Sequence, residues 1–110
     1  MNERTERIGK NEALFRTVNE QVRGISAGLS TATEVMRVVC ECGKADCTEQ
    51  FSVSLEEYAR VRDDSTLFLV RPDHEIPDTE TVVDTTDDYF VVQKDPGEPA
   101  ALAQATDPRS

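Results

Sequence analysis

The sequence has no tryptophan, one histidine and no long apolar run, and these absences narrow what the protein can be. No apolar stretch approaches the roughly 20 residues that a helix needs to cross a bilayer, so we do not expect a membrane protein. The first residues, Met1 to Arg7, are polar and charged, unlike an apolar export signal. Together with an odd number of cysteines, three in all, these features predict a cytoplasmic protein with reduced thiols.

Basic residues are scarce over most of the chain, whose net charge is −10. Residues 1–37 carry six basic and five acidic side chains, whereas residues 38–110 carry six basic and seventeen acidic ones. Because such an acidic surface repels phosphate backbones and anionic lipid, we expect neither nucleic acid nor a membrane as partner. The acidity can serve solubility alone, and another protein, of unspecified identity, is the expected partner.

A chain of 110 residues is long enough for one small domain. We expect a flexible N-terminus over residues 1–10, a folded domain over 11–94, and a disordered tail over 95–110 that is rich in proline, alanine, glycine and aspartate. A core of this size is marginally stable by itself, so a bound metal would contribute substantially to the stability of the fold.

A helix is predicted from about Asn11, as N-cap, to Ile25. Apolar residues recur there at helical spacing and should face the core, namely Leu14, Phe15, Val18, Val22, Ile25 and Leu29. The residues expected on the solvent side are Glu12, Arg16, Glu20 and Arg23. Gly24 and Gly28 should end the helix and lead into a linker with Ser26, Ser30 and Thr31.

The rest of the domain is predicted to be mainly β-strands, with one short helix. Apolar alternation over 35–42 and 50–55 predicts a hairpin, and Ser54 with Glu57 fits a capping box that begins a short helix over 55–62. A buried strand over 66–71, a turn-rich loop from Pro72 to Asp78, and a second hairpin over 80–94 should follow. We therefore predict an α+β fold with one antiparallel sheet of four to five strands, an N-terminal helix and a short inserted helix.

The residues with clear chemical meaning are Cys40, Cys42, Cys47 and His74. Three thiolates and an imidazole make a complete tetrahedral set for zinc. Alternating strand positions let Cys40 and Cys42 reach one ion, and Gly43 should permit a tight turn toward Cys47. The set is therefore predicted to bind one structural zinc ion, with small buried cysteines and an exposed histidine as the alternative.

The fourth ligand has to come from outside the cysteine cluster. His74 lies 27 positions after Cys47, and a strand over 66–71 would carry it to the cysteines. Asp73 or Glu75 could orient its imidazole. If His74 is not a ligand, then Asp46, Glu49, water or a partner's side chain could complete the site.

Several motifs in this order resemble a family of small uncharacterised actinobacterial proteins. They are Asn11-Glu12-Ala13-Leu14-Phe15-Arg16, Cys40-Glu41-Cys42-Gly43 with Cys47-Thr48-Glu49, Leu55-Glu56-Glu57-Tyr58, and Pro72-x-His74-Glu75-x-Pro77. The resemblance covers about residues 11–94 and brings no established function with it. Members of that family often carry glycine at the position of Asp73, so the loop before His74 is where this chain departs from the pattern.

Three functions fit these residues. The first is a non-enzymatic zinc protein that serves as an interaction or regulatory module. The second is a redox sensor with an iron–sulfur cluster, since three cysteines and one histidine can also hold two irons. The third is an enzyme with Cys47 as nucleophile and His74 as base, although no oxyanion hole or orienting third group is recognisable.

Overall fold

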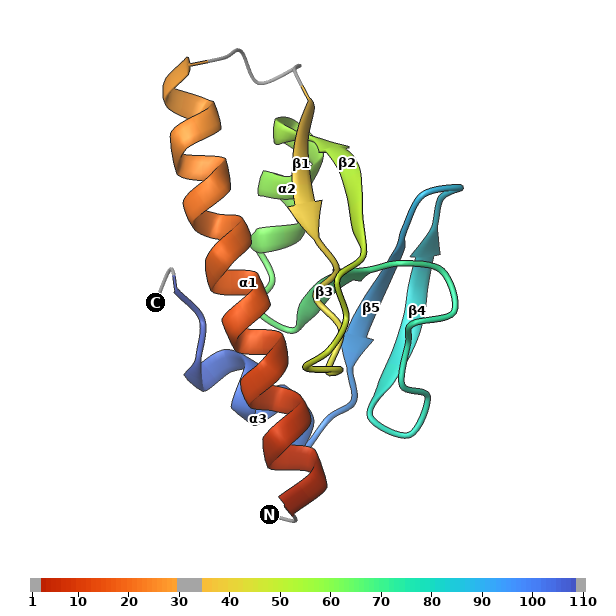
Figure 1. Ribbon diagram of the computed structural model, residues 1–110. Coiled ribbons are helices and arrows are strands. Elements are labelled where there is room, and N and C mark those ends of the chain that lie inside the picture. Colours follow the sequence, from red (N-terminus) through yellow and green to blue (C-terminus); the bar gives the residue numbers. More distant parts are fainter. Residues whose placement is uncertain (1–2, 30–34, 109–110) are drawn as a thin grey trace.

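The computed structural model describes residues 3–29 and 35–108 and contains three helices and five strands within them (Figure 1). The order is α1 (Glu3–Leu29), β1 (Val35–Val39), β2 (Gln50–Ser54), α2 (Leu55–Arg62), β3 (Leu67–Val70), β4 (Glu80–Thr85), β5 (Phe90–Lys94) and α3 (Glu98–Ala105). The α+β fold class predicted from the sequence is confirmed. The linker expected at Ser30 and Thr31 lies outside the described residues.

The strands form two antiparallel sheets instead of the one sheet that we expected. β1 pairs with β2, and β5 lies between β3 and β4. The β1–β2 ladder ends near Val39, after which Cys40 N–H still donates to Glu49 O at 2.9 Å but Glu41 N–H donates to Leu69 O in β3 at 2.8 Å. The cysteine segment therefore leaves one sheet and joins the edge of the other, which divides the strands between two small sheets.

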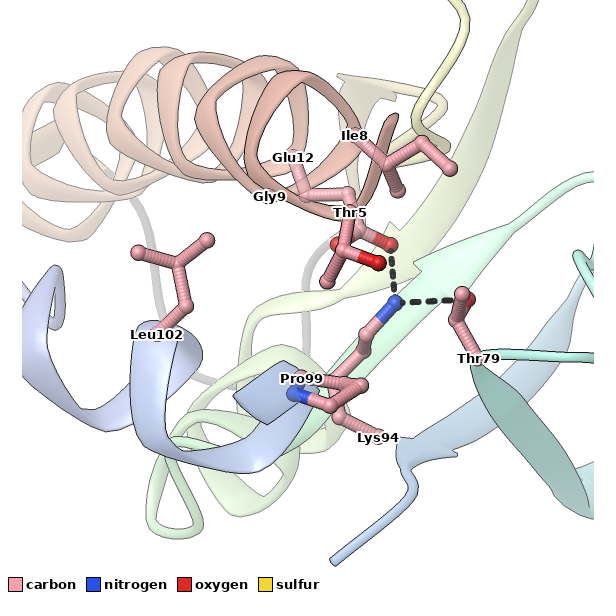
Figure 2. Close-up of a pocket in the computed structure, with 8 residues that line it drawn as sticks. All are labelled: Thr5, Ile8, Gly9, Glu12, Thr79, Lys94, Pro99 and Leu102. Carbon is pink, nitrogen blue, oxygen red and sulfur yellow. Dashed lines mark hydrogen bonds and ion pairs between the residues drawn. The ribbon is translucent and has the colours of Figure 1, made fainter. Parts of the chain in front are cut away.

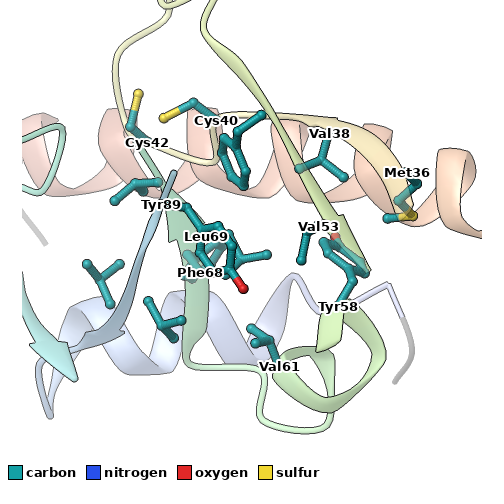
Figure 3. Packing of buried hydrophobic residues seen from close by; sticks show 14 of the residues in the cluster. Met36, Val38, Cys40, Cys42, Val53, Tyr58, Val61, Phe68, Leu69 and Tyr89 are labelled. Carbon is teal, nitrogen blue, oxygen red and sulfur yellow. The ribbon is translucent and has the colours of Figure 1, made fainter. Parts of the chain in front are cut away.

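The apolar alternation predicted for the hairpin is confirmed. Met36, Val38, Phe51 and Val53 are buried, and they pack with residues from α2 and the second sheet into one core (Figure 3). The short helix begins at its predicted N-cap, since Ser54 Oγ accepts from Glu57 N–H at 3.0 Å, but the Glu57 carboxylate accepts from Arg60 instead of completing the capping box. This side-chain cap satisfies a backbone donor that the first turn of α2 would otherwise leave unpaired.

The orientation predicted for α1 is wrong. The helix begins at Glu3, inside the segment expected to be flexible, and continues past Gly24 to Leu29. Glu12, Arg16 and Asn19 are at most 1% exposed, whereas Leu14 is 59% and Ile25 is 67% exposed. The buried face of α1 is therefore largely polar. Of the apolar residues predicted to face the core, Leu14, Val18 and Ile25 are exposed and Phe15 and Val22 are half-buried, while the side chain of Leu29 lies outside the described part of the chain.

Polar residues can occupy this face because each finds partners from distant parts of the chain. Arg16 donates to Ser65 O at 2.7 Å and to Ala103 O at 2.8 Å, and its guanidinium lies 4.7 Å from the centre of the Phe68 ring. Asn19 Nδ2 donates to Val39 O at 2.8 Å. A buried polar group is tolerated when its hydrogen bonds are made, which is why periodicity alone misplaced the helix.

The disordered tail predicted from residue 95 is also corrected. Residues Glu98–Ala105 form α3, which lies beside the first half of α1 (Figure 1). Ala103 is 5% exposed, and its carbonyl accepts from Arg16 in α1. The alanine-rich composition therefore reflects a helix that packs closely, not a segment without structure. None of the described helices combines the length and apolar character that a bilayer crossing requires.

A buried charge network joins α1 to the second sheet. Lys94 Nζ lies 2.9 Å from Glu12 Oε2 and donates to Thr79 Oγ1 at 3.1 Å (Figure 2). It also lies 2.9 Å from Glu80 Oε1. All three charged side chains are at most 2% exposed, and a cavity of only about 10 Å³ adjoins Glu12 and Lys94. One ammonium thus serves two carboxyl groups, so ionising both would leave an excess negative charge in the interior.

That excess makes the stability of the fold depend on pH. Burial raises the pKa of Glu12 to about 8, and Glu80 adds to the rise while Lys94 opposes it. Between about pH 4.5 and 8 the folded chain therefore keeps a proton that the unfolded chain has lost, so stability should fall as pH rises through this window. Thermal unfolding from pH 5 to 9 should show this fall for the native chain and a flatter profile for Glu12→Gln. A Glu12→Gln profile that parallels the native one would contradict the assignment.

Candidate metal centre

The structure brings together the four side chains that the sequence singled out. The Sγ atoms of Cys40, Cys42 and Cys47 and a ring nitrogen of His74 all lie within 4.8 Å of one another, an arrangement that could hold a metal ion. His74 Nδ1 is 3.6 Å from Cys40 Sγ and 3.6 Å from Cys47 Sγ. Cys40 and Cys42 are buried and Cys47 is half-buried, so the group lies at the rim of the core (Figure 3).

A tight turn delivers His74 to the cysteines. His74 N–H donates to Arg71 O at 3.0 Å, with Pro72 second in the turn and Asp73 third. Asp73 has a φ of 70°, so the turn has the proline and the left-handed residue that a type II turn prefers. Apart from glycine, aspartate is one of the few residues that adopts this conformation readily.

The backbone at Asp73 gives a testable order of stability. Asp73→Gly should be at least as stable as the native chain, Asp73→Asn should match it, and Asp73→Val should lose about 1–2 kcal/mol, because a β-branched side chain clashes in the left-handed region. Thermal unfolding of the metal-loaded chains measures this order. Equal stabilities for the glycine and valine variants would show that the turn does not require a left-handed residue.

The loop that carries the cysteines is packed tightly at Gly43. A Cβ atom built there would lie 2.5 Å from Ile8 Cγ2 and 3.1 Å from Ile76 Cδ1. Asn11, expected to cap a helix, instead lies within α1 and donates from Nδ2 to Gly43 O at 2.9 Å. Glycine is therefore needed here for the close approach of α1 and the loop that carries His74.

Backbone amides surround the sulfur atoms. Arg71 N–H donates to Cys40 Sγ at 3.2 Å, and amides of Lys44 and Glu49 hydrogen-bond to Cys42 and Cys47. The hydrogen bond from Cys40 lowers the pKa of Cys42 to about 5, and the same bond together with burial raises the pKa of Cys40. The sulfur atoms are thus close enough for one thiol to donate a hydrogen bond to its neighbour, and a bound cation would displace the proton between them.

Glu41 is a residue of this site that the sequence interpretation missed. It lies between two cysteines, and strand alternation placed it on the side opposite to them. In the structure Cys40, Glu41 and Cys42 are 2%, 0% and 1% exposed, so both sides of this segment are covered. A carboxylate with no exposure needs donors around it, and the molecule supplies several.

Those donors connect the cysteine segment to three other elements. Glu41 Oε2 accepts from Asn19 Nδ2 in α1 at 2.9 Å and from Tyr58 OH in α2 at 2.9 Å. Its Oε1 accepts from Leu69 N–H in β3 at 3.0 Å, and Arg62 Nη2 lies 3.4 Å away. Two features of the sequence could have pointed to Glu41: its place between two cysteines and the polar Asn19 within a predicted helix. Neither feature indicates that the two side chains bind each other.

The other candidates for the site are not part of the cluster. Asp46 and Glu49 are exposed and do not belong to the group of four ligand atoms. Within the described ranges, no hydrogen bond joins His74 to Asp73 or Glu75, and Glu75 Oε1 is buried without a hydrogen-bond partner. The expectation that one of these carboxylates orients the imidazole is therefore not met in this conformation.

Comparisons with models of protein families, with curated proteins and with solved structures find no match to this chain. The resemblance to the actinobacterial family therefore stays a prediction. The four gathered side chains are therefore the main indication of what this chain binds.

Proposed function

We propose that this chain is a non-enzymatic protein that binds one zinc ion through Cys40, Cys42, Cys47 and His74. In this proposal the zinc is structural and supports a domain that acts in protein–protein interaction or regulation. The observation that carries the proposal is the gathering of all four ligand atoms within 4.8 Å.

The distances suit a single tetrahedral ion. Zinc–sulfur bonds of about 2.3 Å and zinc–nitrogen bonds of about 2.0–2.1 Å place a thiolate sulfur and an imidazole nitrogen about 3.6 Å apart in a tetrahedron. Both Cys40 and Cys47 have their sulfur 3.6 Å from His74 Nδ1. An iron–sulfur cluster, with two irons and bridging sulfides between pairs of ligands, needs more space than this group leaves.

A structural role is supported by the closed ligand set. Catalytic zinc sites keep one position for water or substrate, whereas here the protein supplies four ligands. The ion would join the end of the β1–β2 hairpin to the loop between β3 and β4. Because His74 Nδ1 is equally close to two sulfurs, the pairing of one nucleophile with one base that an enzyme would need is less well supported.

Elemental analysis tests the proposal directly. The full chain, purified from medium without added metal, should contain about one zinc per chain and be colourless, and the variants Cys47→Ser and His74→Ala should contain much less. The control Asp46→Ser, altered at an exposed residue beside the cluster, should keep its zinc.

Two results would overturn it. Iron with visible absorption after anaerobic purification would favour the iron–sulfur cluster. Protein that contains no metal and is nevertheless fully folded would show that the fold needs no metal. Rapid alkylation of a single thiol in the metal-replete chain would instead support the cysteine enzyme.

A further inference from the structure

The outward face of α1 carries an apolar stripe that no other described part of the chain covers. Leu14 is 59%, Val18 is 37% and Ile25 is 67% exposed, although α1 packs against β1, α2 and α3 on its other side. Figure 1 shows α1 running along one side of the molecule. Exposed apolar groups gathered in this way commonly mark an interaction surface.

The spacing of the stripe is that of a two-helix seam. Leu14, Val18, Gln21 and Ile25 are separated by four, three and four residues, as the inner positions of a coiled coil are. This spacing reads the same in both directions. Two such helices in antiparallel arrangement would place Leu14 of each copy beside Ile25 of the other, and Val18 beside Gln21. The face is therefore complementary to itself, which a two-fold symmetric contact requires.

Charge favours a second copy at this face over any other part of the molecule. Residues 38–110 carry seventeen acidic and six basic side chains, so two copies that met through them would repel each other. Over residues 3–25 of α1 the count is five basic and four acidic side chains. Like-charged copies can thus approach most closely along α1.

From these observations we infer that two copies of this chain associate through α1 in antiparallel arrangement, with Leu14, Val18 and Ile25 at the contact. The seam from Leu14 to Ile25 is about 17 Å long, since each helical residue rises about 1.5 Å. A strip of that length and one helix wide, about 10 Å, covers much less than the roughly 1,200 Å² that stable interfaces bury. The dimer is therefore reversible, and it forms at high protein concentration. The inference does not depend on the identity of the metal.

Sedimentation velocity of the metal-loaded full chain over a concentration series tests this inference. As its concentration rises, the native chain should shift from monomer toward dimer, with a dissociation constant below about 1 mM. Leu14→Lys or Ile25→Glu alone should raise this dissociation constant at least about tenfold. The double variant should recover dimerisation, because antiparallel helices bring each new lysine beside a new glutamate. Val83→Lys, at a 51% exposed valine in β4, is the matched control and should dimerise like the native chain.

Circular dichroism and metal content of each variant separate this effect from loss of the fold. A native chain that stays monomeric throughout, single variants that dimerise normally, or a double variant that stays monomeric although folded would each overturn the inference. So would a Val83→Lys variant that loses dimerisation as strongly as Leu14→Lys does.

Discussion

Replacing Cys42 with serine should destabilise the whole domain, not one part of its surface. The zinc proposed here joins the cysteine loop to the loop that carries His74, and structural zinc contributes on the order of 10 kcal/mol to the folding of small peptides. Small domains are typically stable by only about 5–15 kcal/mol. We therefore expect Cys42→Ser to lose its cooperative thermal transition or to melt far below the native chain, which calorimetry or circular dichroism would measure.

A chelator distinguishes this result from the loss of a small buried side chain. If the cysteines were only buried apolar groups, Cys42→Ser would cost about 1–3 kcal/mol and a chelator would leave the native chain unaffected. With a structural metal, the chelator should bring the native chain toward the behaviour of the variant, while Asp46→Ser should respond as the native chain does. A Cys42→Ser variant that melts like its parent, with and without chelator, would show that no metal stabilises the fold.

The second large effect is expected at Lys94. Its Nζ lies 2.9 Å from each of two buried carboxylates, those of Glu12 and Glu80. Lys94→Met would remove the one cation that both carboxyl groups contact, and breaking a buried ion pair in this way costs about 3–5 kcal/mol. Chemical denaturation at neutral pH should show this loss.

A compensated variant isolates the charge as the cause. Adding Glu12→Gln and Glu80→Gln to Lys94→Met should restore most of the stability, because no unpaired charge then remains buried. Lys10→Met is the matched control, since Lys10 pairs with Glu6 at an exposed position and should change stability by less than about 1 kcal/mol. A Lys94→Met chain as stable as the Lys10→Met chain would refute the importance of the network.

The strands and the short helix were predictable because their signals are local. The alternation of Phe51 and Val53 with Gln50, Ser52 and Ser54 gives a half-buried strand wherever the core lies. Ser54 caps α2 through a bond to a residue three positions away. Each of these features depends on neighbours in the sequence, so the tertiary structure had little opportunity to alter it.

The direction of α1 could not be predicted in this way. A helical stripe of apolar residues normally faces the core, yet here Arg16 and Glu12 do so because Ala103 and Lys94 satisfy them from more than 80 positions away. Residues 98–105 were misjudged for the same reason, since α3 is held against α1 by such contacts. No local pattern reveals partners at that separation.

The sequence alone determined which side chains can bind a metal, the order in which they occur and the strands that flank them, since these depend on residue type and short-range spacing. The tertiary structure decided that His74 meets the three sulfurs, that Glu41 turns inward, and that α1 buries its polar face. These outcomes depend on hydrogen bonds and ion pairs between segments that are distant in the sequence. Such interactions stabilise the chain only after folding has brought both partners together.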